Sequence, residues 1–156
     1  MAQMSKEEKK NWYDLCDYLH YNILGYTKDM KFPKFLAIRL KGLAEGNFIA
    51  NKKTAPNASY TFKEILITSK LCSCKIKNYF TDNTTKIKDE KHKINLIMMF
   101  IEQEINDVVL RLKKQQSTEN EIERLNLENH SANQAEYKSE TTDKTSNARG
   151  RFDSLW

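Results

Sequence analysis

Glycine and cysteine are scarce in this sequence, which has four glycines and three cysteines among its 156 residues. So few glycines leave little material for phosphate-cradling turns, and the chain contains no glycine-rich phosphate loop, nucleophile elbow or paired-histidine zinc motif. An odd number of cysteines with one close pair argues against a disulfide framework and favours a reducing compartment. We therefore expect a protein that is not an enzyme and requires no cofactor.

Long hydrophobic runs are also missing. No apolar stretch approaches the ~20 residues that span a bilayer, and residues 1–10 lack the hydrophobic core of a signal peptide. The mean hydropathy of −0.74 is polar for a fully globular chain, which suggests that part of the chain does not fold. We expect a cytoplasmic protein with no membrane partner.

Positive charge is concentrated in the first three quarters of the chain. Up to residue 116, 21 lysines and arginines stand against 13 acidic residues, a balance of +8; from residue 117 onward 5 stand against 8, a balance of −3, and the two sum to the net +5. A basic body favours a polyanionic partner such as DNA, because phosphate neutralisation supplies most non-specific affinity. The alternative is a solvated lysine-rich surface with no such partner.

Local signals predict two helices in the first third of the chain. A capping box at residues 5–8 opens a helix over residues 6–24, and a proline opens a second helix over residues 33–45. Each is followed by a glycine, which favours a stop. Residues 47–59 are predicted to form a loop.

Two further helical segments follow. A second capping box begins a helical hairpin at residues 61–80, whose predicted break at residues 71–73 gives the layout of a helix-turn-helix. The strongest pattern in the chain lies over residues 89–114, where Asp89 is a suitable cap. Apolar side chains recur there at steps of three and four along one stripe: Ile94, Ile97, Met98, Ile101, Ile105, Val108 and Leu112.

These elements predict an all-α protein. Residues 5–115 form a small basic helical domain with a helix-turn-helix-like hairpin and one long C-terminal amphipathic helix. Residues 116–150 are predicted to form a mostly disordered polar linker, because they cannot bury enough apolar surface to offset the entropy of ordering. Residues 151–156 form a C-terminal aromatic short linear motif.

Lysines gather on the predicted hairpin and just beyond it, and recognition helices use such side chains against phosphates and base edges. The candidate DNA-binding residues are Lys70, Ser73, Lys75, Lys77, Asn78, Lys86, Lys88, Lys91 and Lys93. The break lacks a glycine, and the region lacks arginine for bidentate contacts to guanine. The alternative is a helical hairpin with ordinary exposed lysines.

Four potential zinc ligands occur in two pairs, Cys16 with His20 and Cys72 with Cys74. The Cys-x-Cys spacing does not match that of structural zinc sites, so we expect buried free cysteines and no metal. Three acidic residues of the long helix are interpreted as a solvated face and not as an acid/base pair: Glu102, Glu104 and Asp107.

The last six residues place large apolar side chains at the end of a polar tether. The candidate partner-binding residues are Arg151, Phe152, Leu155 and Trp156, because aromatic anchors dominate many interfaces. The ending Ser154-Leu155-Trp156 resembles peptides that dock on bacterial sliding clamps, although the glutamine that usually begins such peptides is absent. The alternative is that the tip folds back on its own domain.

Three segments and the polar loop at 81–88 carry a wider resemblance: Lys75-Ile76-Lys77, Lys91-His92-Lys93-Ile94-Asn95 and Ile105-Asn106-Asp107-Val108. Residues 60–112, which contain them, resemble segments of replisome-organiser-type replication accessory proteins from phages and mobile elements of Gram-positive bacteria. The resemblance implies a helical DNA-binding module, a polar tail ending in an aromatic motif, and DNA and replisome proteins as partners.

Two functions are therefore expected. The first is a non-enzymatic phage or mobile-element adaptor that binds DNA through its basic helical body and recruits a replication protein, such as a sliding clamp, through its tail. The alternative is a phage-encoded protein-binding inhibitor or adaptor of a host replication, transcription or defence complex, with no direct DNA contact. A homodimer through the long helix is compatible with both.

Overall fold

The computed structural model describes residues 3–48, 53–54 and 59–152, with side chains described for 3–48 and 59–129. The predicted all-α class is confirmed. The helices are α1 (Lys6–Tyr18), the π-helical turn η1 (Leu19–Ile23), α2 (Lys34–Ala44), α3 (Phe62–Asp82), the short 3-10 turn η2 (Thr84–Lys86) and α4 (Glu90–Phe152). Two strands of two residues each, β1 (Asn47–Phe48) and β2 (Lys53–Thr54), pair antiparallel within the predicted loop.

The helices begin where short polar motifs satisfy their first backbone amides. The Glu8 amide donates to Ser5 Oγ at 3.1 Å and the Ser5 amide to Glu8 Oε2 at 3.0 Å. Thr61 and Glu64 repeat this reciprocal pair at 3.2 and 2.8 Å. Asp89 accepts from the amide three residues on at 2.7 Å, at the start of α4. Both predicted capping boxes and the predicted aspartate cap are confirmed.

Helix ends follow the two predicted glycine stops. Gly25 and Gly46 adopt positive φ angles of 69° and 83°, which glycine tolerates without steric cost. Before Gly25 the first helix widens into η1, where the Leu24 amide donates to the Leu19 carbonyl five residues back at 2.9 Å. The predicted helix over 6–24 is therefore an α-helix that ends in a π turn.

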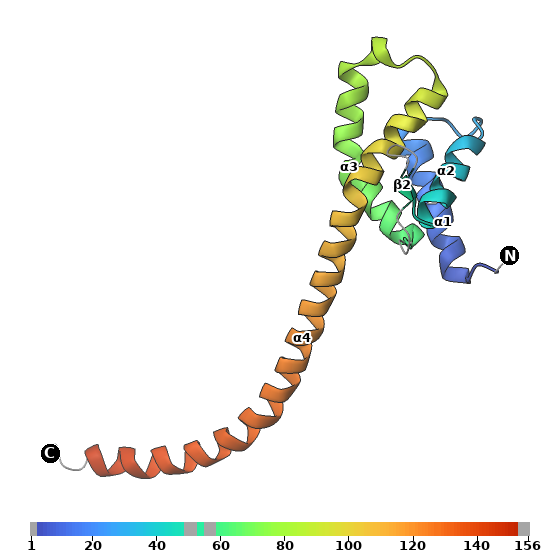
Figure 1. Cartoon of the computed structure of the whole chain (residues 1–156). Helices are drawn as coiled ribbons and strands as arrows, with labels where there is room; N and C mark the ends of the chain where they lie inside the picture. Colours follow the sequence, from blue (N-terminus) through green and yellow to red (C-terminus); the bar gives the residue numbers. More distant parts are fainter. Residues whose placement is uncertain (1–2, 49–52, 55–58, 153–156) are drawn as a thin grey trace. The chain divides into compact units, whose positions relative to one another are not determined.

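The predicted break at residues 71–73 is wrong, because α3 continues through it without interruption. The segment has no glycine or proline to end a helix. Cys72 is buried against α4, with its Sγ 3.8 Å from the Phe100 carbonyl, and the Ser73 hydroxyl donates back to the Lys70 carbonyl at 2.9 Å. The predicted helix-turn-helix break is thus absent, and the hairpin is formed by α3 and the first turns of α4 (Figure 1).

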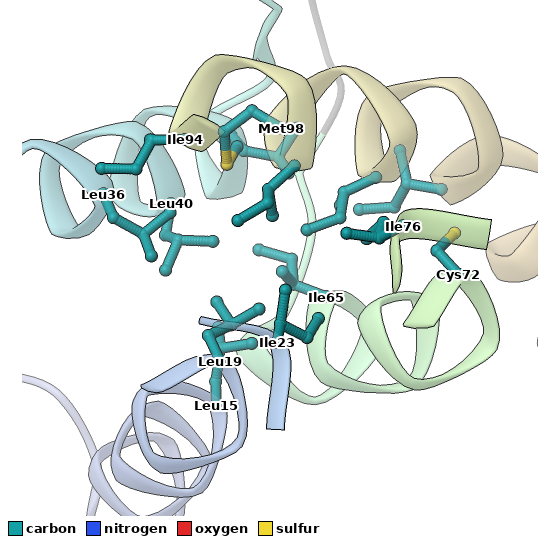
Figure 2. Close-up of a cluster of buried hydrophobic side chains, with 14 of the residues drawn as sticks. Leu15, Leu19, Ile23, Leu36, Leu40, Ile65, Cys72, Ile76, Ile94 and Met98 are labelled. Carbon is teal, nitrogen blue, oxygen red and sulfur yellow. The ribbon is translucent and has the colours of Figure 1, made fainter. Parts of the chain in front are cut away.

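The core is built around the predicted stripe of α4. Six of its seven members are buried, from Ile94 to Val108, and Leu112 is half-buried. Figure 2 shows Ile94 and Met98 facing Leu36 and Leu40 of α2, while side chains of α1 and α3 close the cluster from the other side. Four helices therefore bury one continuous apolar cluster, and most of the burial energy of the domain is expected to come from it.

The chain divides into two compact units, Met1–Arg111 and Leu112–Trp156. In the second unit the backbone is helical as far as Phe152, well past residue 114, where the sequence placed the end of the helix. Every described side chain from 113 to 129 is exposed, so no packing is seen to support this part of the helix. The disordered linker over 116–150 and the domain boundaries stay predictions.

Candidate nucleic-acid interface

The hairpin of α3 and α4 carries all nine predicted DNA-binding residues, but the structure divides them into two groups. Lys70, Ser73 and Lys75 are committed to contacts inside the domain. The Lys70 ammonium lies 5.6 Å from the centre of the Tyr18 ring, and Lys75 pairs with Glu104 at 2.6 Å. That pairing raises the pKa of Lys75 and lowers the pKa of Glu104, mainly through the hydrogen bond between them. Lys70 and Lys75 stay exposed, so these contacts engage their ammonium groups without removing them from solvent.

The second group lies toward the connection between the two helices. The exposed members are Lys77, Asn78, Lys86, Lys88 and Lys91. Lys93 belongs with them but is half-buried, with its ammonium 5.2 Å from the centre of the Phe80 ring. No ion pair is found for this group among the described side chains, so its positive charge faces solvent uncompensated by a direct partner.

A segment that the sequence analysis did not include lies beside this group. The connector between η1 and α2 is held to the start of α4 by the Tyr26 hydroxyl, which donates to Glu90 Oε1 at 2.6 Å. Burial, followed by this bond and the Glu90 charge, raises the pKa of Tyr26 to about 12. The connector carries the exposed Lys28 and Lys31.

Lys28 and Lys31 were missed because they lie more than fifty positions before Lys86 and the lysines that follow it. The only local indication is the spacing of the two lysines in a short polar connector. We use the name "basic end" for five exposed lysines of the connector and the hairpin: Lys28, Lys31, Lys86, Lys88 and Lys91.

An aromatic cluster centred on His20 stiffens the connector. The buried His20 donates from Nε2 to the Thr27 carbonyl at 3.1 Å, an assignment that the acceptor requires. Its ring stacks on Tyr21 at 4.7 Å and lies edge-on to Tyr26 at 5.6 Å. Phe32 approaches from the far end of the connector at 6.2 Å. His20 therefore holds the connector through its bond to Thr27 and its ring contacts.

The other three zinc-ligand candidates are the cysteines Cys16, Cys72 and Cys74. Cys16 is half-buried and Cys72 buried, and burial raises the pKa of Cys16 to about 12 and raises that of Cys72, which disfavours the thiolate that zinc requires. Cys74 is exposed. Within the described part of the chain, no three metal-ligating side chains gather.

Glu102 does not lie on a solvated face as predicted: it is 5% exposed. It acts on Arg39 of α2, which is 6% exposed and whose guanidinium lies 5.6 Å from the centre of the Phe35 ring. Burial lowers the pKa of Arg39, and the Glu102 charge opposes that change. The prediction failed because position 102 directly follows the buried stripe residue Ile101 and lies near enough to Arg39 of α2 for the two charges to interact. Asp107 is exposed, as predicted, and Glu104 is partly exposed beside Lys75.

The predicted partner-binding residues Arg151, Phe152, Leu155 and Trp156 lie outside the described side chains. Among the described helices, none has an apolar stretch of the length needed to cross a membrane. The expected absence of a membrane partner stays a prediction.

Comparison with known proteins identifies a family. The model of the family described as SPbeta prophage protein YorH matches residues 1–150. The chain belongs to this family. The YorH match includes the whole hairpin and the connector, and the aromatic segment 151–156 lies beyond it. A prophage family agrees with the expected phage or mobile-element protein. No curated protein and no solved structure matches the chain significantly.

Proposed function

We propose that this phage-family protein is a non-enzymatic adaptor that binds nucleic acid through the basic end and recruits a replication protein through its C-terminal segment. The observation that carries the nucleic-acid half is the exposure of the five basic-end lysines, without a direct acidic partner among the described side chains. The surrounding charge supports it, because the chain up to residue 116 has a balance of +8.

The shape of the hairpin favours contact with phosphates over reading of base edges. Because α3 is continuous, no short helix is presented in the manner of a recognition helix. The segment 60–110 contains no arginine for a bidentate contact to guanine. Lysines on flexible stems suit phosphate oxygens as point charges. The expected binding therefore depends little on sequence and strongly on salt.

A salt titration tests this half. Binding of the protein to a fluorescent oligonucleotide is followed by anisotropy, and affinity is expected to fall linearly on a log scale as salt rises. Lys88→Gln with Lys91→Gln should weaken binding and reduce the slope by about 1.4–1.8, since each lost phosphate contact removes ~0.7–0.9. Lys9→Gln with Lys10→Gln is the matched control, because both residues are exposed near the start of α1. A salt-independent affinity, or equal losses in the two variants, contradicts the proposal.

The recruitment half rests on the composition of the last six residues. It is tested by a nuclease-treated pull-down from a Gram-positive host lysate, with the intact chain and a version ending at Gly150. A replication protein captured only by the intact chain supports the proposal. Capture of the same partner by both versions assigns the interaction to the helical body and removes the role of the tail.

A second candidate is a protein-binding inhibitor or adaptor with no nucleic-acid contact. It is favoured by large hydrophobic side chains of the first unit, one on each α-helix, that are more than half exposed: Tyr13, Ile38, Leu71 and Leu110. Such side chains are ordinary singly and mark an interface only when contiguous. The same pull-down distinguishes the candidates, because this one requires a partner that survives nuclease while the oligonucleotide shows no binding.

A further inference from the structure

The ring of Tyr21 is exposed, and its orientation is held from beneath. It stacks on His20 with ring centres 4.7 Å apart and planes 22° apart, while 44% of the residue remains open to solvent. His20 cannot swing away without breaking its bond to the Thr27 carbonyl and its edge contact with Tyr26. One face of the Tyr21 ring is thus covered by the buried His20 imidazole. The exposed surface of Tyr21 is therefore the opposite face and the edge of the ring.

Hydrogen bonds connect the backbone beside this ring to the basic end. The Tyr26 amide donates to the His20 carbonyl at 3.0 Å, and the Tyr26 hydroxyl donates to Glu90 of α4 at 2.6 Å. Two bonds from a single residue therefore tie η1, the connector and the start of α4 together. Lys28 follows Tyr26 by two residues, and Lys88 and Lys91 flank Glu90 within two positions. The exposed ring and these cations belong to one end of the first unit.

We propose that this end binds single-stranded nucleic acid, with Tyr21 as a platform on which one base stacks and the lysines of the basic end contacting the flanking phosphates. This deepens, and rests on, the proposed nucleic-acid function. Single-stranded sites combine a cationic track with aromatic rings, because every base offers a flat face regardless of its identity. A duplex covers those faces by stacking them on each other, so a fixed exposed ring adds nothing to duplex affinity.

The charges around the site favour an extended polyanion whose negative groups are spaced along a chain. Residues 26–34 and 84–93 together hold seven lysines and three acidic residues, Asp29, Asp89 and Glu90, a balance of +4. Glu90 is occupied by the Tyr26 hydroxyl, although its charge remains. A compact anion such as free phosphate would meet one or two of these lysines, whereas an extended strand reaches several. Tyr21 would then lie between phosphate contacts.

Variants at two tyrosines of the same helical segment test the stacking role. The probes are a fluorescent oligothymidylate of about 12 nucleotides, within the range of single-strand site sizes, and a duplex of equal length. Tyr21→Ala should weaken single-strand binding about tenfold, the low-to-middle part of the range for one stacked base, and leave duplex binding unchanged. Tyr21→Phe should bind as the parent does, because the ring is kept. Tyr13→Ala is the matched control, since Tyr13 is 65% exposed on α1.

The outcomes separate this inference from the function on which it rests. Absence of binding to either probe overturns both. Salt-dependent binding with equal or greater affinity for the duplex overturns only the single-strand assignment. Equal effects of Tyr21→Ala and Tyr13→Ala, or a loss in Tyr21→Phe as large as in Tyr21→Ala, overturn the stacking role. Thermal unfolding of each variant shows whether a loss comes from the fold, and a Tyr21→Ala loss accompanied by an unchanged midpoint supports the platform.

Discussion

The buried charge pair between α2 and α4 gives a sharp test of what holds these helices together. Glu102→Gln keeps the size of the side chain but removes its charge. The Arg39 guanidinium then stays buried without the negative charge that opposes the lowering of its pKa. Its Nε has no hydrogen-bond partner among the described residues, so the arginine depends strongly on the nearby charge. Breaking such a pair costs ~3–5 kcal/mol, and we expect about 3 kcal/mol because the Phe35 ring continues to cover the guanidinium.

That loss is a large fraction of the ~5–15 kcal/mol that stabilises a typical domain. Urea unfolding at neutral pH, followed by circular dichroism, measures it directly. Glu104→Gln is the matched control, because Glu104 lies two positions away on the same helix in an exposed pair with Lys75, and its loss should change stability little. Arg39→Met combined with Glu102→Gln should recover much of the loss, because no buried charge remains. The reasoning is refuted if Glu102→Gln costs no more than Glu104→Gln.

Three further predictions concern the ends of helices and the exposed ion pair. Gly25→Ala should destabilise the domain by about 1–2 kcal/mol because of the positive φ of 69°. Gly42→Ala should stabilise it by ~0.5–1 kcal/mol, because Gly42 lies inside α2 and the nearest atom to a new Cβ is 3.9 Å away. Thermal unfolding that ranks the two variants in reverse would contradict the backbone argument. Thr61→Ala should cost ~1 kcal/mol by removing the cap of α3, with urea midpoints as the measure and no change as the contrary result. The Lys75–Glu104 pair raises the pKa of Lys75 and lowers that of Glu104. Its contribution to stability should therefore be lost as pH falls through the lowered carboxyl pKa and as pH rises through the raised ammonium pKa. Lys75→Ala should remove the pair's part of both limbs of the pH–stability curve.

Helix ends and the core stripe could be predicted because their causes are local. Ser5, Thr61 and Asp89 each bond to an amide three residues away, and the burial of the stripe follows from its repeat along one helix. The same locality explains the error within α3. Cys72 and Ser73 are only moderate helix formers in isolation. Cys72 is buried against α4, however, and the local sequence pattern does not show that contact.

The candidate interface could be predicted only in part. The lysines of the hairpin are close in sequence, so their grouping could be seen from the sequence. The connector joins them through the bond between Tyr26 and Glu90, which are 64 positions apart. No periodicity or local motif in the sequence predicts a contact between residues so far apart. The burial of Glu102 was missed for the same reason, because it depends on where α2 crosses the stripe.

The π turn at the end of the first helix has a consequence for the history of the family. In an α-helix the Leu19 carbonyl would accept from Ile23, but here it accepts from Leu24, so the turn holds one residue more than an α-helix needs. A single-residue deletion could therefore be absorbed there by a return to α geometry, with the helix itself kept. A relative that lacks one residue of this segment can have lost it inside the helix, and an alignment that moves the gap into the neighbouring connector would then pair Tyr21 with the wrong residue.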